Sequence, residues 1–208
     1  MIKTICVFSS SSSAVNSVYR DTAIDLGKRL GQEGLNLIFG GADVGLMGII
    51  ARTAQNHGAK VIGVIPEPLA GKGIAYQEAD ELIISNNLRD RKEIIESKSD
   101  AFIALPGGFG TLEEIMEILT LKQLQFHNKP IVFINTNGYY DNLIAQFETG
   151  YQENFAKKEY KELYYFSESA ENAIDYIKYY TPKQLPRDRK STRLNSSHLK
   201  LSRMPSSA

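Results

Sequence analysis

One short segment of the chain combines the residue types that hold a phosphate group. Gly107, Gly108 and Gly110 lie between the apolar run Ala101–Leu105 and a stretch with helical periodicity. Glycine lets backbone N–H groups approach a ligand closely, and the N-terminus of a helix carries partial positive charge. Thr111 can cap the helix that follows and can also donate a hydrogen bond to a phosphate oxygen. The segment therefore predicts a phosphate-binding turn.

Three carboxylates follow this turn. Glu114 stands three residues after Thr111, which is the spacing of a capping box and would be a purely structural reason for that residue. Glu113 and Glu117 lie close by in the sequence, however, and carboxylates repel a bound anion unless they face another part of the ligand. We therefore expect a ligand with phosphate at one end and a centre that requires a carboxylate at the other.

A predicted helix at 87–98 supplies the cations Arg89, Arg91 and Lys92. A run of mixed charges on a helix is often only a solvated, salt-bridged face. This run also follows a predicted strand, and in parallel sheets ligands bind where the strands end. On the residues alone, a solvated face and a ligand-facing turn both remain open.

Two further turns carry small residues. Ser9–Ser13 follows the first predicted strand, and its hydroxyls, including that of Ser11, either bind phosphate or form a polar loop with a helix cap. Gly40 and Gly41 follow the second predicted strand, where glycine allows either close approach of a ligand or tight packing of a helix. Neither turn has the pattern G-x-G-x-x-G, and G-x-x-x-x-G-K-[ST] is absent, so NAD binding and P-loop NTP hydrolysis lack their signatures.

Short apolar runs alternate with helix-periodic stretches along the chain. We expect strands at 2–8, 35–39, 60–65, 81–84, 101–105, 131–135 and 163–166, and helices at about 15–33, 44–57, 87–98, 111–125, 139–149 and 169–180. Nearly all-apolar strands with intervening helices indicate a parallel sheet that is covered on both faces. The predicted fold is therefore α/β, a Rossmann-like doubly wound parallel sheet with helices on both faces, in a single nucleotide-binding domain at 1–182.

The composition is that of an ordinary globular protein: 208 residues, 42% of them hydrophobic, with 24 basic and 24 acidic side chains. No apolar run approaches the roughly 20 residues that span a bilayer, and the first residues lack the apolar region of a signal peptide. The single cysteine, Cys6, excludes an internal disulfide and a zinc site built from cysteines. With only three histidines as well, we expect a cytoplasmic protein without a metal site.

The charges are divided unevenly between the body and the C-terminal segment. Residues 188–208 hold five basic side chains and one acidic, whereas residues 1–187 hold 19 basic and 23 acidic. An acidic body does not indicate nucleic-acid binding. The serine-rich segment 183–208 is predicted to be disordered. A basic arm is one interpretation of 188–208, but D-R-K-S-T-R-L-N-S-S-H resembles a translated sequencing adapter, so we interpret it as an artefact.

The candidate residues together resemble a known family. Arg91–Lys92 with Pro106–Glu114 is similar to the P-G-G-x-G-T-x-x-E signature of the Lonely Guy (LOG) family, cytokinin-activating nucleoside 5′-monophosphate phosphoribohydrolases long labelled lysine decarboxylases. The resemblance runs from about Ile5 to Tyr180. It includes F-G-G-A-D-V-G-L-M-G at 39–48, G-V-I-P at 63–66, S-D-A-F-I-A-L-P-G-G at 99–108, L-K-Q-L-Q-F-H-N-K-P at 121–130 and N-G-Y-Y-D-N-L at 137–143.

This resemblance implies hydrolysis of the N-glycosidic bond of AMP or an N6-modified AMP to free base and ribose 5-phosphate, without a metal or organic cofactor. It implies that Arg91 and Glu114 are the catalytic pair. It also implies a homodimer with its sites near the subunit interface. The implied substrate-binding residues are Lys92, Gly107, Gly108, Phe109, Gly110, Thr111, Leu112, Glu113 and Thr120. From their place in the turns after the first two predicted strands, we also predict that Ser11, Gly40 and Gly41 bind the substrate.

The chain departs from the family pattern at a few positions, where substrate recognition is expected to differ. Gly73 stands where the family usually has a glutamate that contacts the substrate, and Tyr76 stands where a histidine is common. Leu88 and Arg89 replace the usual residues before the Arg91–Lys92 pair.

Two other functions compete with hydrolysis. A non-catalytic nucleotide sensor or carrier would need the glycines but not the pair Arg91 and Glu114, so retention of that pair favours an enzyme. Lysine decarboxylation would need pyridoxal phosphate and a lysine that forms a Schiff base, and no sequence feature singles out such a lysine.

Overall fold

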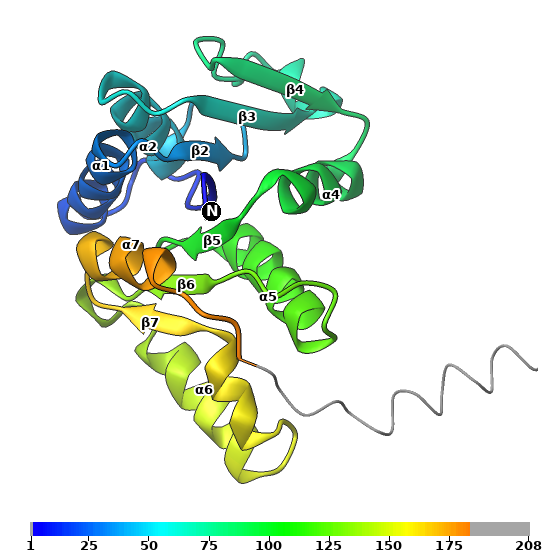
Figure 1. Cartoon of the computed structure of the whole chain (residues 1–208). Helices are drawn as coiled ribbons and strands as arrows, with labels where there is room; N and C mark the ends of the chain where they lie inside the picture. Colours follow the sequence, from blue (N-terminus) through cyan, green and yellow to red (C-terminus); the bar gives the residue numbers. More distant parts are fainter. Residues whose placement is uncertain (1, 184–208) are drawn as a thin grey trace, which may run out of the picture.

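The computed structural model describes residues 2–183, which form one parallel sheet with helices on both sides (Figure 1). The predicted tail at 188–208 lies outside the described residues. The strands are β1 (Thr4–Phe8), β2 (Asn36–Phe39), β3 (Val61–Pro66), β4 (Glu81–Ser85), β5 (Ala101–Ala104), β6 (Ile131–Ile134) and β7 (Tyr165–Ser167). Their order is β4-β3-β2-β1-β5-β6-β7, and every pair of neighbours is parallel. The predicted α/β fold is confirmed.

The longer helices are α1 (Ser17–Gln32), α2 (Gly45–Asn56), α4 (Leu88–Lys98), α5 (Phe109–Gln123), α6 (Asp141–Gln152) and α7 (Ala170–Lys178). The shorter ones are α3 (Glu67–Ala70), η1 (Thr136–Gly138) and η2 (Lys158–Leu163). None of the helices within residues 2–183 combines the length and apolar character that a membrane crossing requires.

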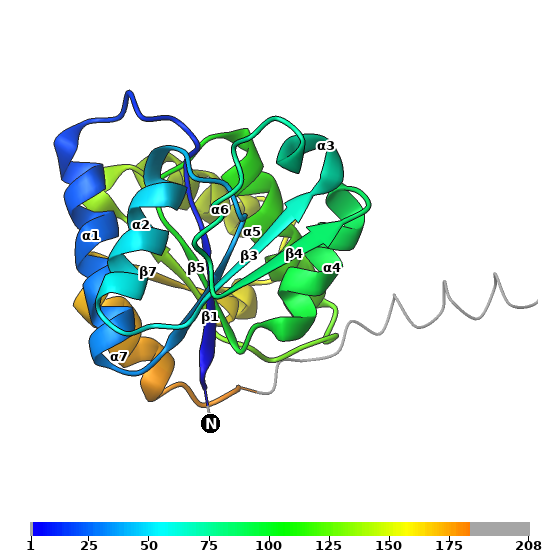
Figure 2. The same ribbon diagram turned by 90° about the horizontal axis from the view of Figure 1, so that it is seen from above.

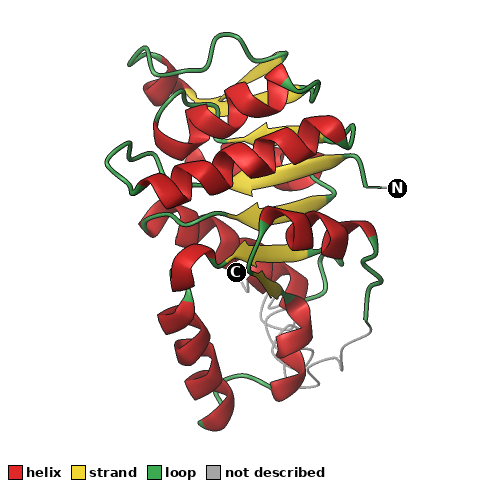
Figure 3. Ribbon diagram, turned by 90° about the vertical axis from the view of Figure 1, so that its left-hand side faces the viewer, coloured by secondary structure: helices red, strands yellow, loops and turns green. Residues whose placement is uncertain are grey.

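Side chains alternate across the sheet and build one core on each face. Ile5 and Val7 of β1 pack with α1, α2 and α7, whereas Cys6 and Phe8 pack with α4, α5 and α6. Figure 3 shows the helices lying along the stacked strands, and Figure 2 shows the strands diverging through the twist of the sheet. Because all strands run parallel, their carboxyl ends and the turns that follow them gather at one edge.

The start of α5 differs from the prediction. The helix begins at Phe109 with Gly108 as its N-cap, so Thr111 already lies inside the first turn. No side chain caps the helix, and the capping-box interpretation of Thr111 and Glu114 is therefore wrong. The sequence rule fails here because it looks for a side chain at the cap, and Gly108 has none.

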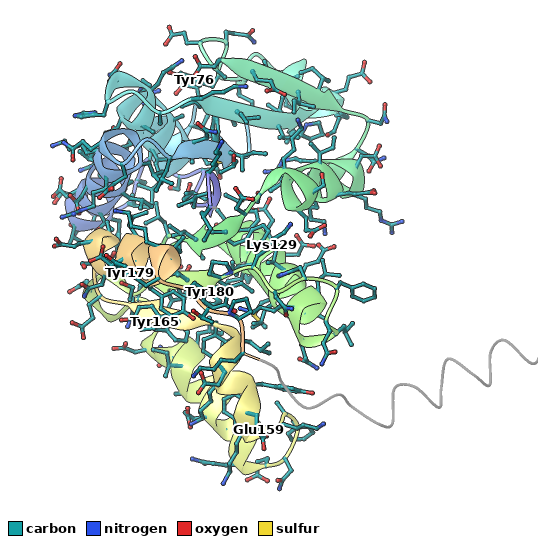
Figure 4. All side chains as sticks on the ribbon, in the orientation of Figure 1. Tyr76, Lys129, Glu159, Tyr165, Tyr179 and Tyr180 are labelled. Atoms are coloured by element: carbon teal, nitrogen blue, oxygen red, sulfur yellow. The ribbon has the colours of Figure 1, made fainter. Side chains whose placement is uncertain are left out.

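The segment after α3 folds back over the turn that follows β2. Ala75 forms an isolated bridge with Ala42, and the Tyr76 N–H donates to the Gly41 carbonyl at 2.9 Å. The Tyr76 ring is buried and its hydroxyl donates to Gln55 at 2.6 Å (Figure 4). Tyr76 is thus a core residue in this chain. Gly73 has a φ of 72° and no atom near a Cβ position. Glycine is therefore favoured there by the left-handed backbone of the turn and not by packing.

Candidate active site

Arg91 and Glu114, the predicted catalytic pair, are joined by a hydrogen-bonded ion pair between α4 and α5. Asn87 begins α4, where its side chain accepts from the Arg89 and Asp90 N–H groups at 2.8 and 3.0 Å. This cap places Arg91 at the end of the first helical turn, above the sheet edge. The two helices therefore bring together residues that lie 23 positions apart.

The Arg91 guanidinium is fixed from two further sides. Its Nε donates to the carbonyl of Val64 in β3 at 3.0 Å, and the residue is 9% exposed. A Cβ at Gly40 would lie 2.5 Å from the Arg91 Nη2. Gly40 was predicted to bind the substrate, and the structure gives it another reason: it makes room for the arginine.

The Glu114 carboxyl is also largely buried, with 13% of its side chain exposed. Burial raises the pKa of Glu114 above its ordinary value, and the charge of Arg91 opposes that shift. Only Oε1 is engaged by Arg91; Oε2 has no hydrogen bond among the described residues. A carboxylate with one oxygen held and one available is suited to interact with a cationic centre or a water molecule.

Lys92, predicted to bind the substrate, bridges two carboxylates of α5. Its ammonium forms ion pairs with Glu113 and, at 2.5 Å, with Glu117. Hydrogen bonds to these two residues raise the pKa of Lys92 above its ordinary value. The three charges form a group beside the Arg91–Glu114 pair rather than at the glycine turn.

The glycine turn itself is open. Gly107 packs so closely on Thr111 that a Cβ there would lie 2.1 Å from the threonine Oγ1. Gly108 and Gly110, in contrast, have no atom within 4 Å of a Cβ position. Since α5 lacks a side-chain cap, no side chain at the cap accepts a hydrogen bond from the first N–H groups of the helix. This arrangement can hold an anion.

The other predicted residues of this helix lie in different surroundings. Phe109 is 93% exposed, and Leu112 packs partly against the core under α5. Thr120 is exposed, and its hydroxyl donates to the Met116 carbonyl at 2.8 Å. Ten residues of helix, about 15 Å, separate Thr120 from Gly110, so the structure does not bring Thr120 to the turn.

The turns after β1 and β2 pack against each other. The carbonyl of Ser10 accepts from the Leu46 N–H at 2.9 Å, and a Cβ at Gly45 would lie 2.4 Å from the carbonyl carbon of Ser11. Ser11 itself is exposed. Gly41 has a φ of 74° and packs against β3. These glycines allow close packing of backbone on backbone.

Three residues at this edge were not among the predicted site residues. Ser9 is 8% exposed, and its hydroxyl has no hydrogen-bond partner among the described residues. Tyr139 and Tyr140 donate hydrogen bonds to the backbone on either side of Pro106. The N-G-Y-Y-D-N-L motif contains both tyrosines, but their contacts depend on a turn that periodicity does not reveal.

A cavity of about 350 Å³ lies between α4 and α5 next to the ion pair. Its lining includes Phe8, Arg89, Lys92, Glu96, Glu114 and Ile118. A larger pocket, of about 560 Å³, lies beside α7 and β7, where Tyr165, Tyr179 and Tyr180 gather (Figure 4). None of the predicted site residues lines that second pocket.

No group of three histidine, cysteine or carboxylate side chains within residues 2–183 is arranged to hold a metal ion.

Residues 47–177 match a family model described as "Possible lysine decarboxylase". The chain is 40% identical over 177 residues to the probable cytokinin riboside 5′-monophosphate phosphoribohydrolase LOGL1 of Oryza sativa subsp. japonica, covering 85% of this chain and 79% of that protein. It is 38% identical to the cytokinin riboside 5′-monophosphate phosphoribohydrolase LOG1 of Arabidopsis thaliana, covering 87% and 85%.

Solved structures share the fold at lower identity. The molybdenum cofactor carrier protein of Chlamydomonas reinhardtii superposes with a TM-score of 0.65 at 22% identity, covering 86% of this chain and 97% of that one. The X-ray structure of TM1055 gives a TM-score of 0.66 at 18% identity, covering 85% and 99%. These likenesses concern the fold alone. By the family match and the identity to the plant proteins, this chain belongs to the Lonely Guy family, whose model carries the lysine decarboxylase description.

Proposed function

We propose that this protein hydrolyses the N-glycosidic bond of adenosine 5′-monophosphate or an N6-modified adenosine 5′-monophosphate. The products are the free base and ribose 5-phosphate. The observation that carries this proposal is the buried Arg91–Glu114 pair at the sheet edge that also carries the open glycine turn. The names of relatives that are 36–40% identical point to the same reaction.

Glu114 acts on the sugar. As the bond between C1′ and the base nitrogen breaks, its electron pair leaves with the base, and positive charge develops on the ribose ring. A carboxylate close to C1′ stabilises that charge and orients the water whose oxygen forms the new bond to C1′. The Glu114 side chain is largely buried, which strengthens this electrostatic effect.

Arg91 acts on the leaving group. The base takes up negative charge as it departs, and a fixed guanidinium stabilises that charge. The hydrogen bond to Val64 and the ion pair with Glu114 hold Arg91 in place before the substrate arrives. The N–H groups at Gly108, Phe109 and Gly110 hold the 5′-phosphate, and Lys92, Glu113 and Thr120 contribute to binding further along the two helices.

A nucleotide carrier on this scaffold is less well supported. The carrier protein from Chlamydomonas shares the fold at only 22% identity, whereas the relatives named as phosphoribohydrolases reach 40%. A carrier also has no use for a buried pair of opposite charges beside its ligand, because desolvating such a pair costs free energy.

Lysine decarboxylation does not fit the lysines near the site. The raised pKa of Lys92 keeps its amine protonated, and a Schiff base needs a neutral amine. Burial lowers the pKa of Lys122 to about 8, but this lysine donates to the Leu163 carbonyl at the far end of α5. It lies 12 residues, about 18 Å of helix, beyond Gly110 in the glycine turn.

We also propose that the protein acts as a cytoplasmic homodimer and does not bind nucleic acid. Apolar side chains beside the site support a second copy, since Leu88 is 59% exposed and Phe109 is 93% exposed. The acidic balance of residues 1–187 argues against a nucleic-acid surface. Light scattering coupled to size exclusion measures the oligomeric state directly.

The test is incubation of the purified protein with AMP, N6-isopentenyl-AMP and adenosine, followed by assay of free base. We expect base release from the monophosphates and much slower release from adenosine, because the glycine turn has no phosphate to hold. The Glu114→Gln variant should lose about 10²–10³-fold in rate. The matched control is Glu159→Gln, an exposed residue of η2 that lies away from α4 (Figure 4). Wild-type turnover in Glu114→Gln would overturn the assignment.

A further inference from the structure

Two tyrosine hydroxyls hold the backbone of the glycine turn from the neighbouring turn after β6. The Tyr139 hydroxyl donates to the Gly107 carbonyl at 2.6 Å, and the Tyr140 hydroxyl donates to the Leu105 carbonyl at 2.8 Å. The two carbonyls flank Pro106, which has no N–H of its own. The strand end and the first glycine are therefore tied to a different element of the fold.

The turn that carries the tyrosines is itself tightly built. The Asn135 side chain accepts from the Tyr140 N–H at 2.6 Å and donates to Asp141 at 2.8 Å. Asn137 and Gly138 follow each other with φ values of 53° and 69°. The left-handed backbone at Gly138 favours glycine, and a Cβ there would lie 2.5 Å from an Asp141 carboxylate oxygen. This geometry fixes where the following tyrosines emerge.

The two rings are packed rather than free. The Tyr139 ring meets the Tyr140 ring edge-on at 5.0 Å and the Tyr19 ring of α1 edge-on at 5.8 Å. Tyr140 is 2% exposed, whereas Tyr139 is 42% exposed. Both hydroxyls are thus already held at the glycine turn before a ligand arrives. Ligand binding therefore costs no further side-chain entropy at these two residues.

The hydrogen bond to Gly107 determines where the next amide points. The Gly107 carbonyl and the Gly108 N–H belong to one planar trans peptide, so they point in opposite directions. When Tyr139 holds the carbonyl on its own side, the Gly108 N–H points away from it. A Cβ at Gly108 has no atom within 4 Å, so the turn is open around this residue. Tyr139 therefore orients the Gly108 N–H, which can donate a hydrogen bond to a phosphate oxygen.

We propose that Tyr139 is a positioning residue for the phosphate-binding turn and that Tyr140 supports it. This proposal rests on the phosphoribohydrolase function proposed above, because it concerns how the same site recognises the 5′-phosphate. Tyr139 touches the turn rather than the reacting atoms. Its loss should weaken recognition of the phosphate and leave the chemistry of Arg91 and Glu114 in place.

The test variant is Tyr139→Phe, which removes one hydroxyl and keeps the ring packing. The matched control is Tyr19→Phe, which removes a hydroxyl from the ring that packs against Tyr139. For Tyr139→Phe we expect the KM for AMP to rise about 3- to 10-fold, the effect of one lost hydrogen bond. We expect kcat to change less than 2-fold and kcat/KM for adenosine to stay unchanged. Inhibition by ribose 5-phosphate should weaken by the same factor as the KM.

The ratio of kcat/KM for AMP to that for adenosine separates the possible outcomes. A fall in this ratio for Tyr139→Phe, but not for Tyr19→Phe, supports the positioning role. If the wild type prefers AMP strongly and Tyr139→Phe keeps the wild-type ratio, the positioning role is overturned while the proposed function stands. Equal losses on both substrates would likewise show a merely structural role. A wild type without preference for AMP would overturn both proposals.

Discussion

The turns after β2 and β5 are both rich in glycine, but they use it in different ways. After β2, Gly41 and Gly45 have positive φ values and lie against backbone atoms, and the Leu46 N–H is taken up by the Ser10 carbonyl. After β5, no atom lies within 4 Å of a Cβ position at Gly108 or Gly110, and the helix has no side-chain cap. The first turn is closed by the protein itself, and the second is left open.

This difference shows that glycine content does not identify a ligand site. A glycine whose Cβ would strike the protein is needed for folding, whereas a glycine with open space around its Cβ position has no packing reason to be glycine. Substitution by alanine separates the two cases, because it should damage stability in the closed turn and function in the open one.

The largest effect is expected for Gly41→Ala in the closed turn. An alanine there would need a left-handed backbone and would place its Cβ 2.9 Å from the Ile65 Cβ and 3.0 Å from Val64. We expect a loss of about 2–5 kcal/mol in the free energy of unfolding, measured by urea denaturation. Gly71→Ala is the control, because that glycine has an ordinary φ and only a carbonyl oxygen at 3.6 Å. Equal stability of the two variants would contradict the packing role of Gly41.

The next effect is expected for Gly108→Ala in the open turn. The new methyl group meets no protein atom, but alanine is a poorer N-cap than glycine, so we expect a loss of about 0.5–1 kcal/mol in the free energy of unfolding. It narrows the approach to the N–H groups at the start of α5, and we expect kcat/KM for AMP to fall about 10²-fold, close to 3 kcal/mol. Steady-state kinetics beside urea denaturation measures both quantities. A loss of stability without a loss of activity would reverse the assignment of this turn.

A smaller effect, of opposite sign, is expected for Gly110→Ala. Gly110 lies in the first turn of α5 with open space around it, and alanine is a better helix former by about 0.5–1 kcal/mol. We therefore expect a higher melting temperature together with weaker binding of AMP. Gly150→Ala in α6 is the matched control, since its Cβ would also meet nothing. Both variants should be more stable, but only Gly110→Ala should raise the KM.

The sheet could be predicted from the sequence because its strands are short, apolar and regularly spaced. The run at 101–105 became β5 (Ala101–Ala104), and the run at 131–135 became β6 (Ile131–Ile134). The short helices α3, η1 and η2 were missed, because a few residues are too short to show a helical period. The start of α5 was missed because its cap, Gly108, has no side chain to recognise.

The site could be predicted only in part. Arg91 and Glu114 were assigned by resemblance, and the structure joins them in one ion pair. The ion pairs of Lys92 with Glu113 and Glu117 depend on how α4 lies against α5, which no local pattern describes. The hydrogen bond from Tyr139 to Gly107 joins residues 32 positions apart and depends on the turn after β6.

The smallest effect concerns the other end of α5, where the buried His127 ring takes up a carbonyl of the helix. His127 is 8% exposed; its Nδ1 accepts from the Lys129 N–H at 3.2 Å, so its Nε2 carries the proton and donates to the Ile118 carbonyl at 3.0 Å. The hydrogen bond from Lys129 requires an unprotonated Nδ1, whereas Nε2 can donate to Ile118 in either charge state. Burial lowers the pKa of His127 below its ordinary value of 6.5. This end of the helix should therefore be sensitive to acid.

The sign of this dependence follows from which state binds the proton first. As the pH falls below 6.5, the unfolded chain protonates His127 before the folded protein does, so the free energy of unfolding decreases until the folded-state pKa is passed. His127→Gln has no group that titrates there. Urea denaturation of both proteins between pH 5 and pH 8 should show the wild type losing stability relative to the variant. The loss should begin as the pH falls through about 6.5. A difference that stays constant across this range would mean that the pKa of His127 does not change on folding and that its burial does not oppose protonation.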